Sequence, residues 1–149
     1  MDINSDIELY SYRNKGGRPR IFESPEEMIE IWDKYVFFCF FLPLKQVVVQ
    51  KVKVSRDEEV IKKVKVPHIR PFNLRSFCLF AEFNEDTFRE YEKREEFIGI
   101  TTHIRDACYS QKFDGAACGF YNANLIALEL GMRNKQEQIE DFKITIEKI

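Results

Sequence analysis

The sequence predicts a mainly α-helical fold with an inserted β-hairpin and a helix-turn-helix. Three observations lead to this fold class. Apolar residues recur at three- and four-residue spacing through residues 24–40 and 97–108, which is typical of amphipathic helices. The spacing changes to two between residues 44 and 70, and two short helical patterns follow each other closely in residues 73–94. The length of 149 residues suits one domain.

We expect three parts along the chain: a flexible basic arm at residues 1–22, a helical domain at residues 23–138, and a tail or strand at residues 139–149. The arm is polar and contains a Gly16-Gly17 pair, which cannot hold a helix.

The end of this arm, residues 13–20, carries four positive charges and no acid. Arg18 and Arg20 are therefore candidates for contacts with DNA phosphates or with a narrow minor groove. An inert basic linker is the alternative.

The first helix of the domain has a clear start. Ser24 is the expected N-cap, Pro25 suits the first turn, and Glu27 completes a capping box. We expect this helix to run to about Phe40 and Pro43 to prevent its continuation.

A β-hairpin is predicted at about residues 45–66. Strands are expected at Val47–Val54 and Val60–Val66, joined by a polar turn. Residues 44–70 contain eight lysines and arginines against three acids, a net of +5 in a chain whose total is −2. One interpretation is a basic wing that grips phosphates, and the other is charge that protects exposed strand edges from aggregation. The candidate DNA-binding lysines are Lys51, Lys53, Lys62 and Lys63.

Residues 73–94 predict a helix-turn-helix. An apolar stripe marks the first helix, and the second begins behind Asn84. Glu82 stands where such a turn usually has glycine, so either the turn is not left-handed or it is strained.

Residues 84–97 hold six acids against three bases, a net charge of −3, which phosphates repel. A plain helical hairpin is the alternative, and any DNA contact here is expected from Arg75, Arg89 and Lys93.

A third helix is expected from Phe97, broken at Asp114-Gly115, and a fourth from Ala116 to Leu130 with Gly131 as its C-terminal glycine. Its expected inner side consists of Phe120, Ala123, Ala127 and Leu128.

The C-terminal segment alternates apolar and polar residues, which predicts either a strand that joins subunits or a frayed helical tail. Its candidate oligomerisation residues are Phe142, Ile144 and Ile146. The chain also has 14 phenylalanines, more than a domain of this kind needs for its own core, so we expect part of the apolar surface between subunits.

Several function classes find no support in the sequence. There is no phosphate-binding loop and no GxGxxG motif, and the four cysteines and two histidines lack metal-ligand spacing. We therefore expect no enzyme, no catalytic residue, no cofactor and no metal. The net charge of −2 argues against bulk-charge binding of DNA. No apolar run is long enough to span a bilayer and no signal peptide is recognised, so we expect a cytosolic protein without a membrane partner.

Four pieces occur in an order that resembles a known family: GGRPR before a capped helix, a helix-turn-helix opened by Pro71-Phe72, a long helix from about Glu96, and a closing FYNANLIALELGMRNKQEQ. Over residues 16–138 the chain resembles the small terminase subunits, the DNA-packaging proteins of tailed bacteriophages and their prophages. The closing motif, which contains Leu130-Gly131 and a charged Asn-Lys-Gln-Glu, is the most specific.

The resemblance implies a ring-forming, non-enzymatic adaptor in the cytoplasm of the bacterial host. Such a protein binds double-stranded viral DNA and delivers it to the large terminase subunit, which carries the ATPase and the nuclease. It also implies that the C-terminal strand joins copies into a barrel. Two alternatives stay open, a helix-turn-helix transcription regulator that binds as a twofold dimer and a structural interaction module.

Overall fold

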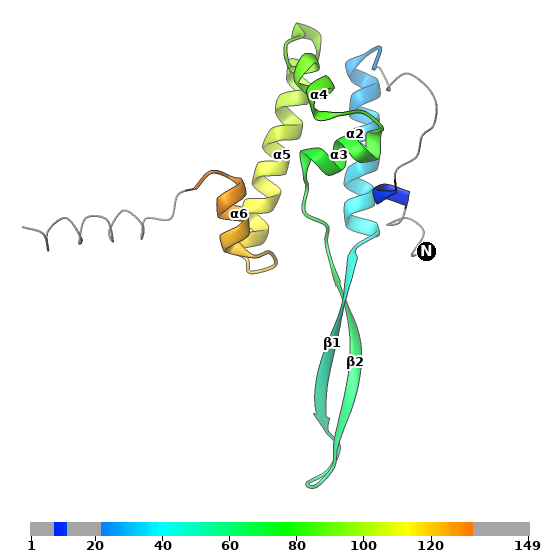
Figure 1. The fold of residues 1–149 in the computed structure, drawn as a ribbon, viewed down its shortest axis with the longest axis vertical. Coiled ribbons are helices and arrows are strands. Elements are labelled where there is room, and N and C mark those ends of the chain that lie inside the picture. The colour runs from blue at the N-terminus through cyan, green and yellow to red at the C-terminus, as the bar shows by residue number, and fades with distance from the viewer. Residues whose placement is uncertain (1–7, 12–21, 133–149) are drawn as a thin grey trace, which may run out of the picture. The chain divides into compact units, whose positions relative to one another are not determined.

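The structure is a computed structural model, which describes residues 8–11 and 22–132. The chain divides into two compact units, residues 1–111 and residues 112–149, and the boundary falls within one long helix. The first unit contains helices and an antiparallel hairpin, in agreement with the predicted mainly α-helical fold with an inserted hairpin (Figure 1). None of the described helices is both long and apolar enough to cross a membrane.

Helix α2 (Pro25–Phe41) begins and ends close to the predicted positions. The Ser24 hydroxyl accepts a hydrogen bond from the Glu27 backbone N–H at 3.4 Å, and the Glu27 carboxylate accepts one from Glu23 N at 3.1 Å. The first bond satisfies a backbone donor that the helix leaves free at its start, and the second holds the residue before the cap. The predicted Ser24 N-cap is therefore confirmed, whereas Glu27 bonds Glu23 N and not the Ser24 N–H that a capping box uses.

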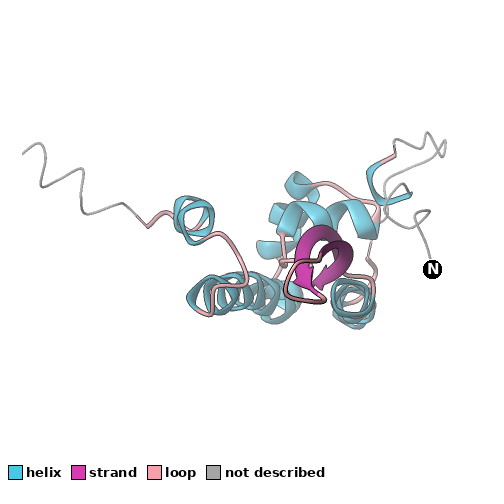
Figure 2. Cartoon of the chain, turned by 90° about the horizontal axis from the view of Figure 1, so that it is seen from below, coloured by secondary structure: helices cyan, strands magenta, loops and turns pink. Residues whose placement is uncertain are grey.

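Strands β1 (Leu44–Lys53) and β2 (Glu59–His68) form the hairpin, within three residues of the predicted bounds. Val54 N and Ser55 N both donate to the Glu58 carbonyl and close the turn. Most of the hairpin is exposed to solvent, and Figure 2 shows the twist of the two strands.

Two short helices follow, α3 (Leu74–Ala81) and α4 (Glu85–Glu92). Each is capped by an asparagine: the Asn73 side chain accepts from Arg75 N at 2.9 Å, and the Asn84 side chain accepts from Thr87 N at 2.7 Å. The turn between them passes through Glu82, which is left-handed at φ 64° and ψ 37°. The turn is thus left-handed without glycine, which is the strained form of the two predicted outcomes.

The core of the first unit is rich in aromatic residues. Trp32 of α2 meets Phe72 and Phe77 edge to face at 5.5 and 5.2 Å between ring centroids. The Tyr35 hydroxyl accepts from Asn73 N at 3.2 Å and donates to Asn73 O at 3.3 Å, which ties the start of α3 to α2. Burying these rings together holds α3 against α2.

Two residues of the predicted arm also pack on this core. Phe22 is buried, and its backbone N–H donates to the Tyr91 hydroxyl at 2.7 Å. Leu9 is partly buried against the same cluster. The chain on both sides of residues 12–21 is therefore attached to the helices.

The predictions for the C-terminal half were partly wrong. After the 3₁₀ turn η1 (Glu95–Phe97), helix α5 (Ile98–Ala117) runs through the expected break at Asp114-Gly115. A Cβ atom on Gly115 would lie 2.3 Å from the ring of Tyr121, so this glycine allows a close approach and does not end the helix.

Helix α6 (Ala123–Glu129) begins seven residues later than predicted, after a turn that Gly119 makes possible at φ 79°. Phe120 and Leu128, expected on its inner side, are exposed, and Ile126 is the buried residue. The end of α6 is as predicted: Gly131 has φ 72°, and Met132 N donates to Ala127 O at 2.8 Å.

Candidate nucleic-acid interface

Five of the six strand lysines lie on one face of the hairpin. In the observed register Lys51 pairs with Ile61 and Val49 pairs with Lys63, so odd-numbered residues of both strands share a face. Lys62 is even-numbered and lies on the other face, with valines as its main neighbours. The lysine face is defined by Lys45, Lys51, Lys53, Lys63 and Lys65.

The lysine face presents unneutralised charge. All five lysines are exposed, and among the described residues none is in an ion pair. The same face holds a single acid, Glu59, which gives five positive charges against one negative, a net of +4. Side chains two residues apart on a strand are separated by about 6.8 Å. The arrangement therefore forms two short rows of cations suited to a polyanion.

Arg70, one of the cations counted at the hairpin, has a structural role. It is buried, its Nε donates to the Leu42 carbonyl at 2.6 Å, and its backbone N–H donates to Cys39 O at 3.3 Å. Its guanidinium also lies 4.7 Å from the centre of the Phe38 ring. Leu42 precedes β1 and Arg70 follows β2, so the Arg70 side chain holds the two ends of the hairpin together. It is therefore not available to bind phosphates.

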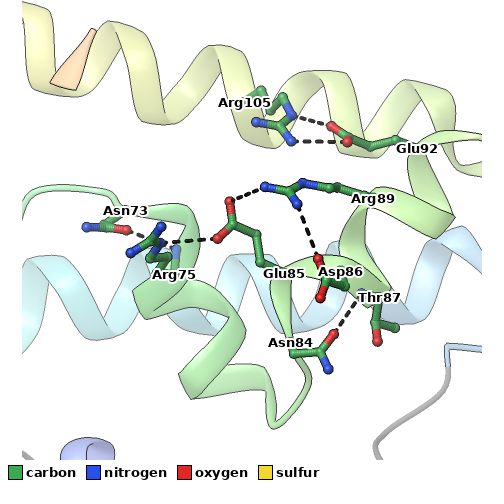
Figure 3. A network of polar contacts seen from close by, with 9 residues as sticks. All are labelled: Asn73, Arg75, Asn84, Glu85, Asp86, Thr87, Arg89, Glu92 and Arg105. Carbon is green, nitrogen blue, oxygen red and sulfur yellow. Dashed lines mark hydrogen bonds and ion pairs between the residues drawn. The ribbon is translucent and has the colours of Figure 1, made fainter.

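The predicted DNA-binding residues around α4 are all in ion pairs. Arg75 Nε lies 3.2 Å from the Glu85 carboxylate, and Arg89 lies 3.2 Å from Asp86 and 3.5 Å from Glu85 (Figure 3). Lys93 Nζ lies 2.7 Å from the Glu90 carboxylate. Each basic side chain here is thus satisfied by an acid close to it.

The acids of α4 outnumber these bases. The helix itself has four carboxylates against Arg89, a net of −3. A fourth cation, Arg105 of α5, is bound to the Glu92 carboxylate, with Nη2 to Oε2 at 3.0 Å. That hydrogen bond raises the pKa of the arginine above its usual value. The surface of α4 would repel phosphate, which is the reverse of the lysine face. The assignment of α3 and α4 as a DNA-reading helix-turn-helix stays a prediction.

Two of the buried cysteines, Cys39 and Cys78, lack the environment of a nucleophile. Burial raises the pKa of Cys39 to about 11 and that of Cys78 to about 12, so both thiols keep their protons at neutral pH. Within residues 8–11 and 22–132, no three His, Cys, Asp or Glu side chains are grouped to hold a metal ion.

Several predicted residues lie outside the described residues. They are Arg18 and Arg20 of the arm and Phe142, Ile144 and Ile146 of the C-terminal segment. Of the four hairpin lysines predicted to bind DNA, the structure brings Lys51, Lys53 and Lys63 to one face and places Lys62 on the other.

Lys45 and Lys65 share the lysine face and were not singled out from the sequence. The signal that identifies them is whether their residue numbers are odd or even. A turn with an odd number of residues pairs odd positions with odd positions, so the predicted five-residue turn already places these two lysines beside Lys51, Lys53 and Lys63.

Comparison with known proteins gives two matches. Residues 17–138 match the family described as DNA-packaging protein gp3. The chain is also 33% identical over 133 residues to the terminase small subunit of Salmonella phage P22, a match that covers 89% of this chain and 78% of that protein. Both matches span the hairpin, α3, α4 and the closing helix.

Proposed function

We propose a DNA-binding, non-catalytic role in genome packaging for this chain, which belongs to the gp3 DNA-packaging family of small terminase subunits. In this role it binds double-stranded viral DNA in the cytoplasm of the bacterial host, as a homo-oligomeric ring. It then delivers the DNA to the large terminase subunit, which supplies ATP hydrolysis and cleavage. The hairpin meets the phosphates, and the chain itself contributes no catalytic group.

The observation that carries this proposal is the lysine face. Its five exposed lysines have no partner carboxylate among the described residues, whereas Arg75, Arg89 and Lys93 each have one. The hairpin lysines can bind phosphate without breaking an ion pair. Around α4, the existing ion pairs would have to open before the basic side chains could bind phosphate. Phosphate contacts fix the position of a protein on DNA without reading its sequence. We therefore expect affinity without strong sequence preference from this face.

The alternative function, a transcription regulator with α4 in the major groove, is less well supported by the same geometry. A recognition helix needs side chains free to reach base edges. Arg89, the single basic residue within α4, is held between Asp86 and Glu85 of its own helix.

A matched pair of charge reversals tests the role of the lysine face. Lys62 and Lys63 are neighbours in the sequence, both are exposed, and they lie on opposite faces. Lys63→Glu should weaken binding to a random-sequence duplex more than Lys62→Glu, although the change in net charge is identical. The triple variant Lys51→Glu/Lys53→Glu/Lys63→Glu should lose at least tenfold in affinity at about 0.1 M salt.

The measurement is fluorescence anisotropy on two unrelated duplexes across a series of salt concentrations. Each lost phosphate contact should reduce the slope of log K against log salt by about 0.9, so the triple variant should have a visibly flatter dependence on both duplexes. Equal losses for Lys62→Glu and Lys63→Glu would contradict binding through the lysine face. An unchanged affinity and slope in the triple variant would contradict DNA binding by the hairpin altogether.

A further inference from the structure

Helix α2 is apolar on two opposite sides in its second half. Trp32, Tyr35 and Cys39 lie in the core, whereas Phe37 and Phe41 are 61% and 65% exposed. The two exposed rings stack on each other, with centroids 4.3 Å apart and planes at 24°. A helix that faces water normally carries polar residues on that side, so this arrangement indicates a surface that is covered in the working assembly. With Phe40, which is half exposed, these rings form the aromatic patch.

A second apolar surface lies in the other unit, on α6. Leu125 and Leu128 are three residues apart on the same side of this helix and are 64% and 78% exposed. The single charged residue of α6, Glu129, is bound to the buried Nζ of Lys112. This surface is therefore uncharged as well as apolar, and we call Leu125 and Leu128 the leucine patch.

The size of the aromatic patch suits the centre of a subunit interface. Its three rings leave about 350 Å² of apolar area in water, taking about 200 Å² for each ring. A standard interface buries about 800 Å² on each partner, with an apolar centre and a polar rim. The charged residues on the outer side of the first half of α2, such as Asp33 and the Glu30–Lys34 ion pair, are suited to that rim.

We propose that the aromatic patch of one copy of this chain receives the leucine patch of the next copy in a head-to-tail contact. The inference rests on the proposed homo-oligomer and names the surfaces that build it. A twofold contact of the aromatic patch with itself would leave every leucine patch exposed. A head-to-tail contact covers both patches of every chain with one kind of interface, and it brings an uncharged surface onto α2. Such a contact forms a ring when its rotation closes.

Two neutral variants test the contact without changing the charge that binds DNA. Phe37→Gln/Phe41→Gln removes the aromatic patch, and Leu125→Gln/Leu128→Gln removes the leucine patch. All four side chains are exposed, so both variants should fold, which circular dichroism and Trp32 fluorescence will verify. Light scattering of each variant alone should give the mass of a single chain, while the wild-type protein gives a multiple of it. Leu79→Gln, a similarly exposed site on α3 outside both patches, is the control and should keep the wild-type mass.

An equimolar mixture of the two double variants gives the decisive result. Each variant retains the patch that the other lacks, so one contact is restored and the mixture should give two-chain complexes and nothing larger. A mixture that stays single-chain would overturn the pairing of the two patches, and so would either variant that alone keeps the wild-type mass. A wild-type protein that is itself a single chain would instead overturn the proposed oligomer, which is a different failure.

Discussion

Glu82 holds a backbone conformation that its side chain disfavours. At φ 64° it takes the place that glycine usually has after a helix, and the hydrogen bonds are those of a helix end: Phe83 N donates to Cys78 O at 3.1 Å and Glu82 N to Leu79 O at 3.3 Å. Burial of Phe77 and Phe83 on either side of the turn keeps the residue there. The strain is therefore offset by the core and not by the turn itself.

Replacing this residue with glycine should stabilise the protein. Glu82→Gly removes the contact between Cβ and the backbone that makes the left-handed conformation costly, and we expect the free energy of unfolding to rise by about 1 kcal/mol. Urea denaturation followed by Trp32 fluorescence would measure the change. Glu82→Ala is the control, because it removes the same carboxylate and keeps the strain. Equal midpoints for the glycine and alanine variants would show that the turn is not strained.

At the scale of single elements, the hairpin and α4 differ in how their charges are satisfied. The hairpin separates its lysines from its acids, which gather at residues 57–59 near the turn. Helix α4 places acids and bases at three- and four-residue spacing, so that each base is paired with an acid. The hairpin and α4 have similar numbers of basic residues nearby, but we expect them to differ in their affinity for a polyanion.

Removing positive charge at α4 should have little effect on DNA binding compared with the same change on the hairpin. Arg89→Gln/Lys93→Gln removes two cations that are already paired, so affinity for a random duplex should stay within about twofold of the wild type. Lys51→Gln/Lys53→Gln, with the same loss of charge, should weaken binding several-fold. Anisotropy at one low and one moderate salt concentration separates the two. A loss for the α4 variant as large as that for the hairpin variant would restore α4 as the DNA-contacting helix.

At the scale of the whole molecule, the apolar surface exceeds what the described core uses. Seven of the phenylalanines that the structure describes are buried, but Phe37, Phe41 and Phe120 are mostly exposed. The predicted surplus of aromatic surface is therefore located on α2 and in the turn before α6. The part of this surface on α2 lies on the element that leads directly into β1.

Removing the C-terminal segment should affect assembly more than folding. Truncation after Gln138 leaves all the elements from α2 to α6 and removes Phe142, Ile144 and Ile146. We expect an unchanged thermal midpoint, together with assemblies that are weaker or variable in subunit number. Native mass measurement over a range of protein concentrations would show this. An identical mass and concentration dependence in the truncated chain would mean that the helical patches alone hold the copies together.

The sequence by itself determined the α2 cap, the hairpin, the two asparagine-capped helices and the glycine end of α6, because each depends on a few neighbouring residues. Tertiary structure decided what depends on distant contacts. Gly115 leaves space for the Tyr121 ring, and the helix continues where the sequence indicated a break. Arg70 is turned inward by Leu42 and Phe38, and the bases around α4 are taken up by carboxylates. The sequence shows which charged residues are present, but only the packing of the folded chain decides which of them remain free to bind a polyanion.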